Sequence, residues 1–202
     1  MLIVAIQVLG VAVLLIGTLV IGRRVRRVRS GESAEHLCRV SHALFWGGLV
    51  LPELTGALYP GLTSFDRLLG IPSLPSSMII QVIGWLLLIP GLHLLGISNL
   101  ALRKDGLGFA AFKLTKSVVV KSVYQQVRNP MSLGYYLACL GIGLISESTY
   151  LVLGSVLLVI PVHLFNLHFF EEHELLARYG NTYSQYMANV PFIIPRICRI
   201  RA

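Results

Sequence analysis

The sequence predicts an all-α, polytopic integral membrane protein with about five transmembrane helices. Hydrophobic residues make up 55% of the 202 residues, charged residues make up 13%, and the mean hydropathy is +0.74. An ordinary soluble domain carries about 25% charged residues, so this chain lacks the polar surface that a water-exposed globule of its size needs. The high apolar content excludes intrinsic disorder, and a total of three cysteines excludes a disulfide scaffold.

Five apolar stretches approach the roughly 20 residues that a helix needs to cross a bilayer. The first, Leu2 to Gly22, precedes a cluster of arginines, whereas a signal peptide carries its basic residues before the apolar run. The second and third stretches are Ser41 to Gly61 and Met78 to Leu100. The fourth and fifth, Met131 to Ser146 and Thr149 to Phe170, are separated by a very short polar break, which predicts a tight helical hairpin.

The distribution of basic residues predicts the orientation. With the N-terminus outside, each of the 17 Lys and Arg residues except Arg67 lies inside or at the inner membrane edge, as the positive-inside rule requires. The C-terminus is then cytoplasmic. The net charge of +8 fits contact with anionic lipid, and nothing in the sequence resembles a nucleic-acid-binding motif.

Two regions are predicted. Residues 1–100 hold three N-terminal spans, and residues 101–202 hold a cytosolic linker, the helical hairpin and a C-terminal amphipathic helix over 171–190. Apolar and aromatic residues recur in that helix at three- and four-residue spacings. Gly180 weakens its middle, and Pro191 ends it.

The entry to the hairpin reads Arg128-Asn129-Pro130-Met131. Asn before Pro at the first helical position is typical of an N-capped helix. Such a helix start directs free N–H groups and the positive end of its dipole toward the cytosol, where a carboxylate or phosphate binds readily. The alternative is a capped helix with an interfacial arginine and no ligand.

The exit from the hairpin carries three carboxylates, Glu171, Glu172 and Glu174. Acids at the C-terminal end of a helix oppose its dipole, which favours a role such as binding ribose hydroxyls, an amine or a cation. The alternative is a solvated junction. Because the hairpin connection is so short, its two helices are antiparallel neighbours, and we expect Arg128 and Asn129 to lie close to Glu171 and Glu172.

Four polar residues inside the spans are candidates for contacting a substrate: Glu53, His93, His163 and Asn166. An ionisable residue within a span is a functional hypothesis by default, and the alternative for each histidine is a hydrogen-bonded packing role. The sequence contains no zinc-ligand spacing, no P-loop and no G-x-S-x-G motif. No metal site is expected.

The C-terminal half contains an ordered series of motifs: Arg128-Asn129-Pro130-Met131, Leu133-Gly134, Glu171-Glu172, Tyr179-Gly180-x-x-Tyr183-x-x-Tyr186, Val190-Pro191 and Pro195-Arg196. Over about residues 101–197 this series resembles the isoprenylcysteine carboxyl methyltransferase and phospholipid methyltransferase superfamily of membrane enzymes. The chain departs from the family pattern at Ser132, where many members have tyrosine.

The resemblance implies an S-adenosylmethionine-dependent methyltransferase whose cofactor pocket faces the cytosol and whose acceptor enters from the bilayer. Arg128 and Asn129 would be the catalytic residues, and Tyr179, Tyr183 and Tyr186 would form the cap of the pocket. The cofactor-binding residues implied are Tyr124, Arg128, Asn129, Pro130, Met131, Gly134, Tyr135, Glu171, Glu172 and Tyr183.

The methyl acceptor and the competing functions remain open at this level. The acceptor implied is a lipophilic small molecule or prenylated group, such as an isoprenylcysteine carboxylate or a phospholipid amine. One alternative function is an NADPH-dependent reductase of the sterol-reductase type, whose C-terminal pattern is similar to Tyr179 through Pro195. The other alternative is a small membrane protein without enzymatic activity. The sequence gives no indication of the oligomeric state.

Overall fold

The computed structural model describes residues 2–28, 31–52, 64–105 and 117–195. The regular elements in these ranges are all helices, with no strand, which confirms the all-α prediction. Short π-helical or 3-10 segments carry the label η. The elements are α1 (Leu2–Val25), α2 (Gly31–Phe45), η1 (Trp46–Val50), α4 (Ser64–Leu69), α5 (Met78–Asp105), η3 (Ser122–Gln125), α6 (Pro130–Ile145), α7 (Thr149–Gly154), η4 (Ser155–Val159), α8 (Ile160–Asn166), η5 (Leu167–Glu171), α9 (Glu172–Tyr179) and α10 (Asn181–Asn189).

The helix lengths fit an integral membrane protein. Within the described ranges, three helices are long and apolar enough to cross a membrane: Leu2–Val25, Met78–Lys104 and Thr149–Tyr179. Helix α6 is apolar but shorter. The predicted span from Ser41 to Gly61 begins in the helix that α2 and η1 form, and the part beyond residue 52 lies outside the described residues.

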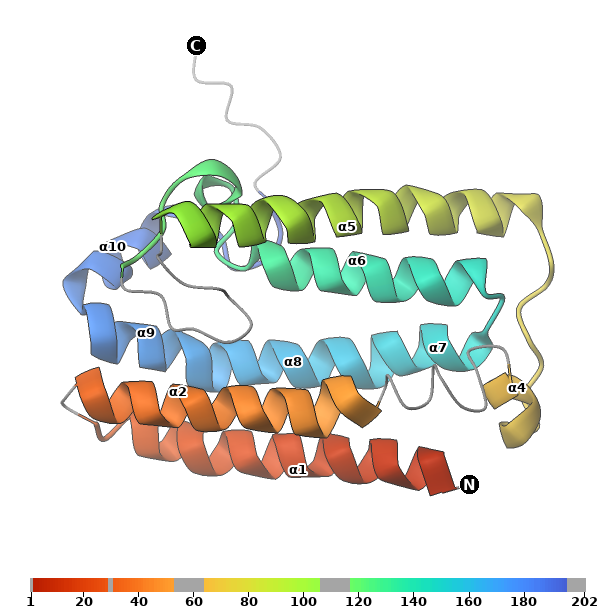
Figure 1. The fold of residues 1–202 in the computed structure, drawn as a ribbon, viewed down its shortest axis with the longest axis horizontal. Coiled ribbons are helices and arrows are strands. Elements are labelled where there is room, and N and C mark those ends of the chain that lie inside the picture. Colours follow the sequence, from red (N-terminus) through yellow and green to blue (C-terminus); the bar gives the residue numbers. More distant parts are fainter. Residues whose placement is uncertain (1, 29–30, 53–63, 106–116, 196–202) are drawn as a thin grey trace, which may run out of the picture.

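The helices form an elongated bundle (Figure 1). The long helix made of α7, α8 and α9 runs between the α5–α6 pair and the α1–α2 pair. Helices α9 and α10 and the segment before α6 gather at one end, while α4 and the N-terminus lie at the other end. Helix α5 continues past residue 100, the predicted boundary between the two regions; that division stays a prediction.

Glycines allow α5 and α6 to pack with their backbones in contact. Gly91 lies against Gly134, and Gly84 lies against Gly141. A Cβ added to Gly134 would come 2.7 Å from the Gly91 carbonyl oxygen, and one added to Gly141 would come 2.8 Å from the Gly84 oxygen. Small residues at a helix interface permit this close approach in membranes, where van der Waals packing drives association.

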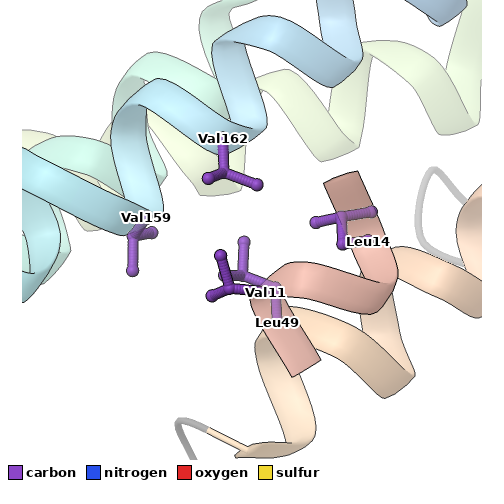
Figure 2. Packing of buried hydrophobic residues seen from close by; sticks show 5 residues of the cluster. All are labelled: Val11, Leu14, Leu49, Val159 and Val162. Carbon is purple, nitrogen blue, oxygen red and sulfur yellow. The ribbon is translucent and has the colours of Figure 1, made fainter. Parts of the chain in front are cut away.

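A second packing centre joins α1 to the long central helix. Figure 2 shows Val11 and Leu14 of α1 beside Leu49 of η1, facing Val159 and Val162. All five side chains are buried. The N-terminal helices are thereby fixed against the helix that carries the carboxylates at positions 171–174.

The predicted hairpin is confirmed, and its tip is held by Asp66 of α4. Helix α6 ends at Ile145 and α7 begins at Thr149. The buried Asp66 carboxylate accepts hydrogen bonds from the backbone N–H groups of Thr149 (3.0 Å) and Tyr150 (2.8 Å) and from the Ser148 hydroxyl (3.2 Å). These bonds satisfy N–H groups that the first turn of a helix leaves without partners.

We expect Asp66→Ala to lower the free energy of unfolding by about 1–2 kcal/mol, because it removes the acceptor of two N–H groups in the first turn of α7, in addition to the N-cap Ser148. Asp66→Asn retains one acceptor oxygen, so its free energy of unfolding is expected to fall by less than that of Asp66→Ala. Thermal unfolding of the two variants in the same detergent tests this order. A loss as large for Asp66→Asn as for Asp66→Ala would contradict a role in capping.

The predicted amphipathic helix over 171–190 is present as two helices. Helix α9 continues the membrane helix from Thr149 to Tyr179, and α10 begins after Gly180, whose φ of 53° lies in the region that glycine tolerates best. The carboxylates Glu171, Glu172 and Glu174 therefore lie within a continuous helix. The expectation that they stand at a helix C-terminus is wrong.

Candidate functional site

A cavity of about 390 Å³ lies at the end of the bundle where α9 and α10 meet the segment before α6. Its walls come from α2, η1, α5, η3, α6, α8, η5, α9 and α10. The volume falls within the range of about 300–1,000 Å³ that is usual for sites binding small molecules and cofactors. Both halves of the chain therefore contribute to the site.

A buried ion pair joins the two ends of the hairpin beside the cavity. Arg128 Nη1 lies 3.0 Å from Glu172 Oε1, and the two side chains are 11% and 5% exposed. The other carboxylate oxygen of Glu172 lies 2.9 Å from His168 Nδ1. The ion pair confirms the predicted proximity of Arg128 to the acidic segment. Arg128 Nε has no hydrogen-bond partner among the described residues.

Asn129 fastens the C-terminal segment to the start of α6. Its backbone N–H and its Nδ2 both donate to the carbonyl oxygen of Phe192, at 3.2 and 3.1 Å, and the Arg128 N–H donates to the Pro191 oxygen at 2.9 Å. Asn129 stands at the N-cap position of α6, but its side chain makes no capping hydrogen bond. The predicted side-chain cap is therefore wrong, because the amide pairs with the chain that follows α10.

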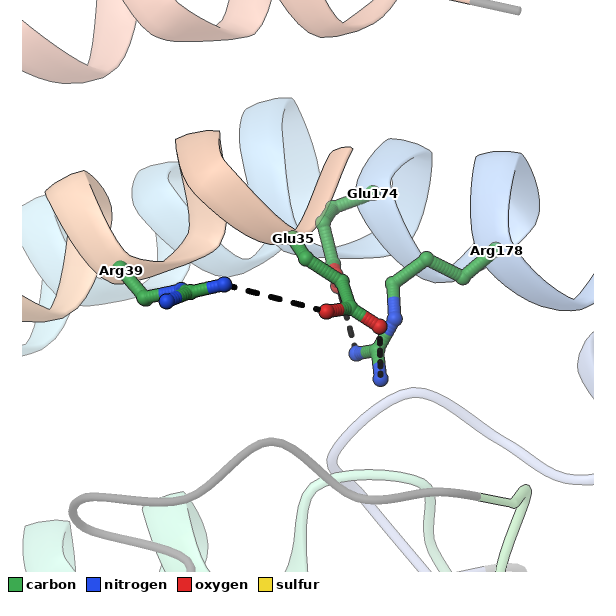
Figure 3. Close-up of polar contacts among 4 residues, drawn as sticks. All are labelled: Glu35, Arg39, Glu174 and Arg178. Carbon is green, nitrogen blue, oxygen red and sulfur yellow. Dashed lines mark hydrogen bonds and ion pairs between the residues drawn. The ribbon is translucent and has the colours of Figure 1, made fainter. Parts of the chain in front are cut away.

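A second group of ion pairs links α2 to α9 along the cavity wall (Figure 3). Arg178 Nη1 lies 3.0 Å from Glu174, while Arg178 Nη2 lies 3.9 Å from Glu35 of α2. Glu35 also faces Arg39 at 4.0 Å. Arg178 and Glu174 line the cavity. Glu174 and Arg178 are four residues apart on one helix, and this spacing in the sequence is typical of an ion pair.

Three tyrosines close the cavity on the side of α10: Tyr179, Tyr183 and Tyr186. The Tyr186 hydroxyl donates to the Tyr124 carbonyl oxygen at 2.7 Å, which joins α10 to η3. Burial raises the pKa of Tyr124 and Tyr183 above the usual range. Burial also raises the pKa of Tyr186, although Arg128 opposes that shift. These phenols stay protonated at neutral pH and remain hydrogen-bond donors.

Polar and aromatic side chains line the part of the cavity inside the bundle. Asn166 Nδ2 donates to Thr18 Oγ1 at 2.8 Å and to Ser41 Oγ at 3.3 Å, which ties α8 to α1 and α2. His163 lies one turn earlier on α8, with its ring centroid 4.5 Å from that of Phe45. Both Asn166 and His163 are buried.

Most of the predicted site residues meet at this cavity. Those in its wall are Tyr124, Arg128, Asn129, Pro130, Met131, Tyr135, His163, Asn166, Glu171 and Tyr183. Ser132, the departure from the family pattern, also lines it.

The other predicted residues lie elsewhere. Gly134 packs against Gly91 of α5, Glu172 stands behind Arg128, and His93 is exposed on α5. None of these three belongs to the cavity lining. Glu53 lies outside the described residues.

Sequence reasoning missed the contribution of α2 and η1. These elements line the cavity with Cys38, Ser41, His42, Phe45 and Trp46. No motif distinguishes the N-terminal half. The polar pair Ser41-His42 at the start of a predicted span is the sequence feature that could have indicated a contribution of α2 to the cavity. Among the described residues, no group of three or more His, Cys, Asp or Glu side chains is arranged to hold a metal ion.

The chain is similar to a known protein family. A family model described as phospholipid methyltransferase matches residues 79–182. That range includes nearly all of α5, the hairpin, α9 and the start of α10, and thus much of the cavity wall. No curated protein and no solved structure gives a significant match.

Proposed function

The chain belongs to the phospholipid methyltransferase family, and on that basis we propose that it transfers a methyl group from S-adenosylmethionine to a lipidic acceptor held in the membrane. Membership of this family indicates that the chain is a membrane methyltransferase. The observation that carries the finer proposal is the cavity itself. Within the family-matched segment, the carboxylate of Glu171 and the guanidinium of Arg128 line one wall of a space large enough for a cofactor.

The lining residues fit the groups that S-adenosylmethionine presents. The Glu171 carboxylate is suited to accept hydrogen bonds from ribose hydroxyls or from the ammonium group. Arg128 and the N-terminus of α6 at Pro130, which both line the cavity, suit the methionyl carboxylate. Tyr183 and Tyr186 cover the cavity from α10.

Glu172 and Asn129 act in this proposal as positioning residues. Glu172 holds the Arg128 guanidinium in place from behind. Asn129 anchors the segment after α10 through Phe192, so that the tyrosines of α10 stay over the cavity. Neither residue needs to touch the reacting atoms.

The bound cofactor would supply an electrophilic methyl group on a positively charged sulfur. The protein's part in such a displacement is to align the acceptor with the methyl group and to exclude water. The tyrosine cap and the apolar wall exclude water, and aromatic ring faces stabilise a positively charged sulfur nearby. The apolar side chains Trp46, Val50 and Leu95 in the wall favour an acceptor that is lipophilic.

The proposal places the site on the cytoplasmic side of the membrane, with the N-terminus outside. The basic residues that follow α1, beginning with Arg23 and Arg24, support this orientation. They lie at the end of α1 that packs near η5 and α9. The site and the basic cluster therefore occupy the same side.

We expect Glu171→Gln to weaken binding of S-adenosylhomocysteine about 10- to 100-fold, since a hydrogen bond to a charged group contributes about 1.5–3 kcal/mol. Calorimetric titration of the purified variant measures this loss. Glu32→Gln, an exposed position on α2, is the matched control and is expected to bind like the unchanged protein. Normal affinity in Glu171→Gln would remove Glu171 from the cofactor site.

A further inference from the structure

The chain around the C-terminal end of α1 carries a group of exposed arginines: Arg23, Arg24, Arg26 and Arg27. None of them forms an ion pair with another residue that the structure describes. The arginines of the cavity differ in this respect, since Arg128 and Arg178 each have a carboxylate partner. Several cations therefore lie at the end of an apolar span without a described anion to balance them.

Two of these arginines have other neighbours. Arg26 Cζ lies 4.3 Å from the centroid of the Phe169 ring in η5, which is a cation–π contact. Arg24 lines an open hollow together with Glu32 of α2. Among the described residues, neither kind of contact is found for Arg23 or Arg27. These two guanidinium groups are therefore the ones most available to a ligand.

Arg23 and Arg27 continue an apolar face of α1. Ile16, Leu19 and Val20 are 62%, 38% and 47% exposed, and their spacing of three, four and seven residues from Arg23 places them on its face of the helix. Arg27 follows Arg23 by four residues, and a backbone hydrogen bond of 3.0 Å from its N–H keeps the chain turning there. We call these five residues the α1 stripe. None of them lines the cavity.

The α1 stripe is complementary in charge and polarity to an anionic phospholipid. Like charges four residues apart on a helix repel each other, and an anion between the two guanidinium groups relieves that repulsion. Guanidinium groups bind phosphate oxygens through paired hydrogen bonds. Basic residues just beyond a span attract lipids whose headgroup carries a net negative charge. A zwitterionic headgroup brings its own cation and therefore fits less well.

We propose that the α1 stripe binds one anionic phospholipid, with its phosphate between Arg23 and Arg27 and its acyl chains along Ile16, Leu19 and Val20. This inference goes beyond the proposed methyl transfer and does not depend on it. The lipid is a structural ligand of α1, separate from any molecule in the cavity.

The bound lipid is expected to stabilise the bundle, because this end of α1 packs on the helix that forms the candidate site. A Cβ added to Gly22 would lie 2.5 Å from Cδ1 of Phe169, and Arg26 covers the same ring. A ligand that binds the folded state raises its stability. At ten times its dissociation constant, the lipid is expected to raise the thermal unfolding midpoint by about 3–6 °C.

The first test is titration of the unchanged protein, in a neutral detergent, with dioleoyl phosphatidylglycerol. Native mass spectrometry counts the bound lipids, and thermal unfolding follows the midpoint. Saturable binding is expected, dioleoyl phosphatidylcholine is expected to bind more weakly, and inorganic phosphate at the same concentration is expected not to displace the lipid. Equal affinity for the two lipids, displacement by phosphate or no binding would overturn the proposal.

The second test locates the binding site. The double variant Arg23→Gln with Arg27→Gln removes both cations but leaves Arg26 on Phe169. Its affinity for the first phosphatidylglycerol bound is expected to fall about 10- to 30-fold, which is the usual contribution of two basic residues at an anionic membrane surface.

The matched control is the double variant Arg103→Gln with Lys104→Gln. It removes the same number of charges from exposed positions at the C-terminal end of α5. Adjacent residues on a helix do not face each other, so these two side chains cannot share one phosphate as Arg23 and Arg27 can. The control is expected to bind phosphatidylglycerol like the unchanged protein. An equal loss in both double variants would indicate a diffuse effect of charge and overturn the assignment to the α1 stripe.

This proposal and the proposed function fail separately. Phosphatidylglycerol binding that requires Arg23 and Arg27, in a folded protein that does not bind S-adenosylhomocysteine, would keep the lipid site and remove the methyltransferase proposal. Binding of S-adenosylhomocysteine without any preference for the anionic lipid would remove the lipid site alone. The double variant of Arg23 and Arg27 is expected to bind S-adenosylhomocysteine like the unchanged protein.

Discussion

Arg128→Met is expected to lower the free energy of unfolding by about 3–5 kcal/mol, because it takes the permanently charged partner from the buried carboxylate of Glu172 and leaves it the His168 imidazole. The pair is short, at 3.0 Å, and both side chains are largely shielded from solvent. The same change removes the guanidinium from the cavity wall. Thermal unfolding in detergent measures the first effect, and titration with S-adenosylhomocysteine measures the second.

The double variant Arg128→Met with Glu172→Gln separates the two roles. The double variant has no buried carboxylate at position 172, so much of the stability that Arg128→Met loses is expected to return. Cofactor affinity is expected to stay low, since Arg128 is still missing. A double variant that regains cofactor affinity would show that Arg128 serves only to hold the helices together.

The second large effect is expected at Gly91. A Cβ at this position would lie 2.8 Å from both the Ala138 nitrogen and the Gly134 oxygen, which are backbone atoms of α6. Backbone atoms cannot move aside as the end of a side chain can, so Gly91→Leu must push α5 and α6 apart. Overpacking of a tight contact costs about 1–3 kcal/mol and sometimes more.

Gly96→Leu is the matched control for this prediction. Gly96 lies on the same helix, and a Cβ added there meets no atom within 4 Å. We expect Gly96→Leu to leave the thermal unfolding midpoint in detergent nearly unchanged, while Gly91→Leu lowers it clearly. Similar midpoints for the two variants would show that the α5–α6 contact contributes little to stability.

Local patterns predicted the helices and the hairpin from the sequence. Apolar runs bounded by charge identified α1 and α5, and the short break before Thr149 forced α6 and α7 to be antiparallel neighbours. That constraint is why Arg128 and Glu172 were expected together, although 44 positions in the chain, from 128 to 172, separate them. Predictions of this kind succeed where a short connection leaves few arrangements.

Contacts between segments far apart in the chain could not be predicted from the sequence. Nothing near Asn129 reveals that its amide bonds to Phe192, so its position before Pro130 favoured a cap that the structure does not contain. The same applies to α2, whose Ser41 and Phe45 reach the cavity because the core around Leu14 packs the N-terminal helices against α8. Tertiary packing alone determines which polar residue of a span faces the site.

The most direct test of the account is calorimetric titration of the detergent-purified, folded protein with S-adenosylhomocysteine, with NADPH titrated in parallel. The account predicts saturable binding of S-adenosylhomocysteine and none of NADPH. Binding of NADPH alone would instead support a membrane reductase. Failure of the folded protein to bind S-adenosylhomocysteine would contradict the proposal that the cavity between α6, α9 and α10 is a methyl-donor site.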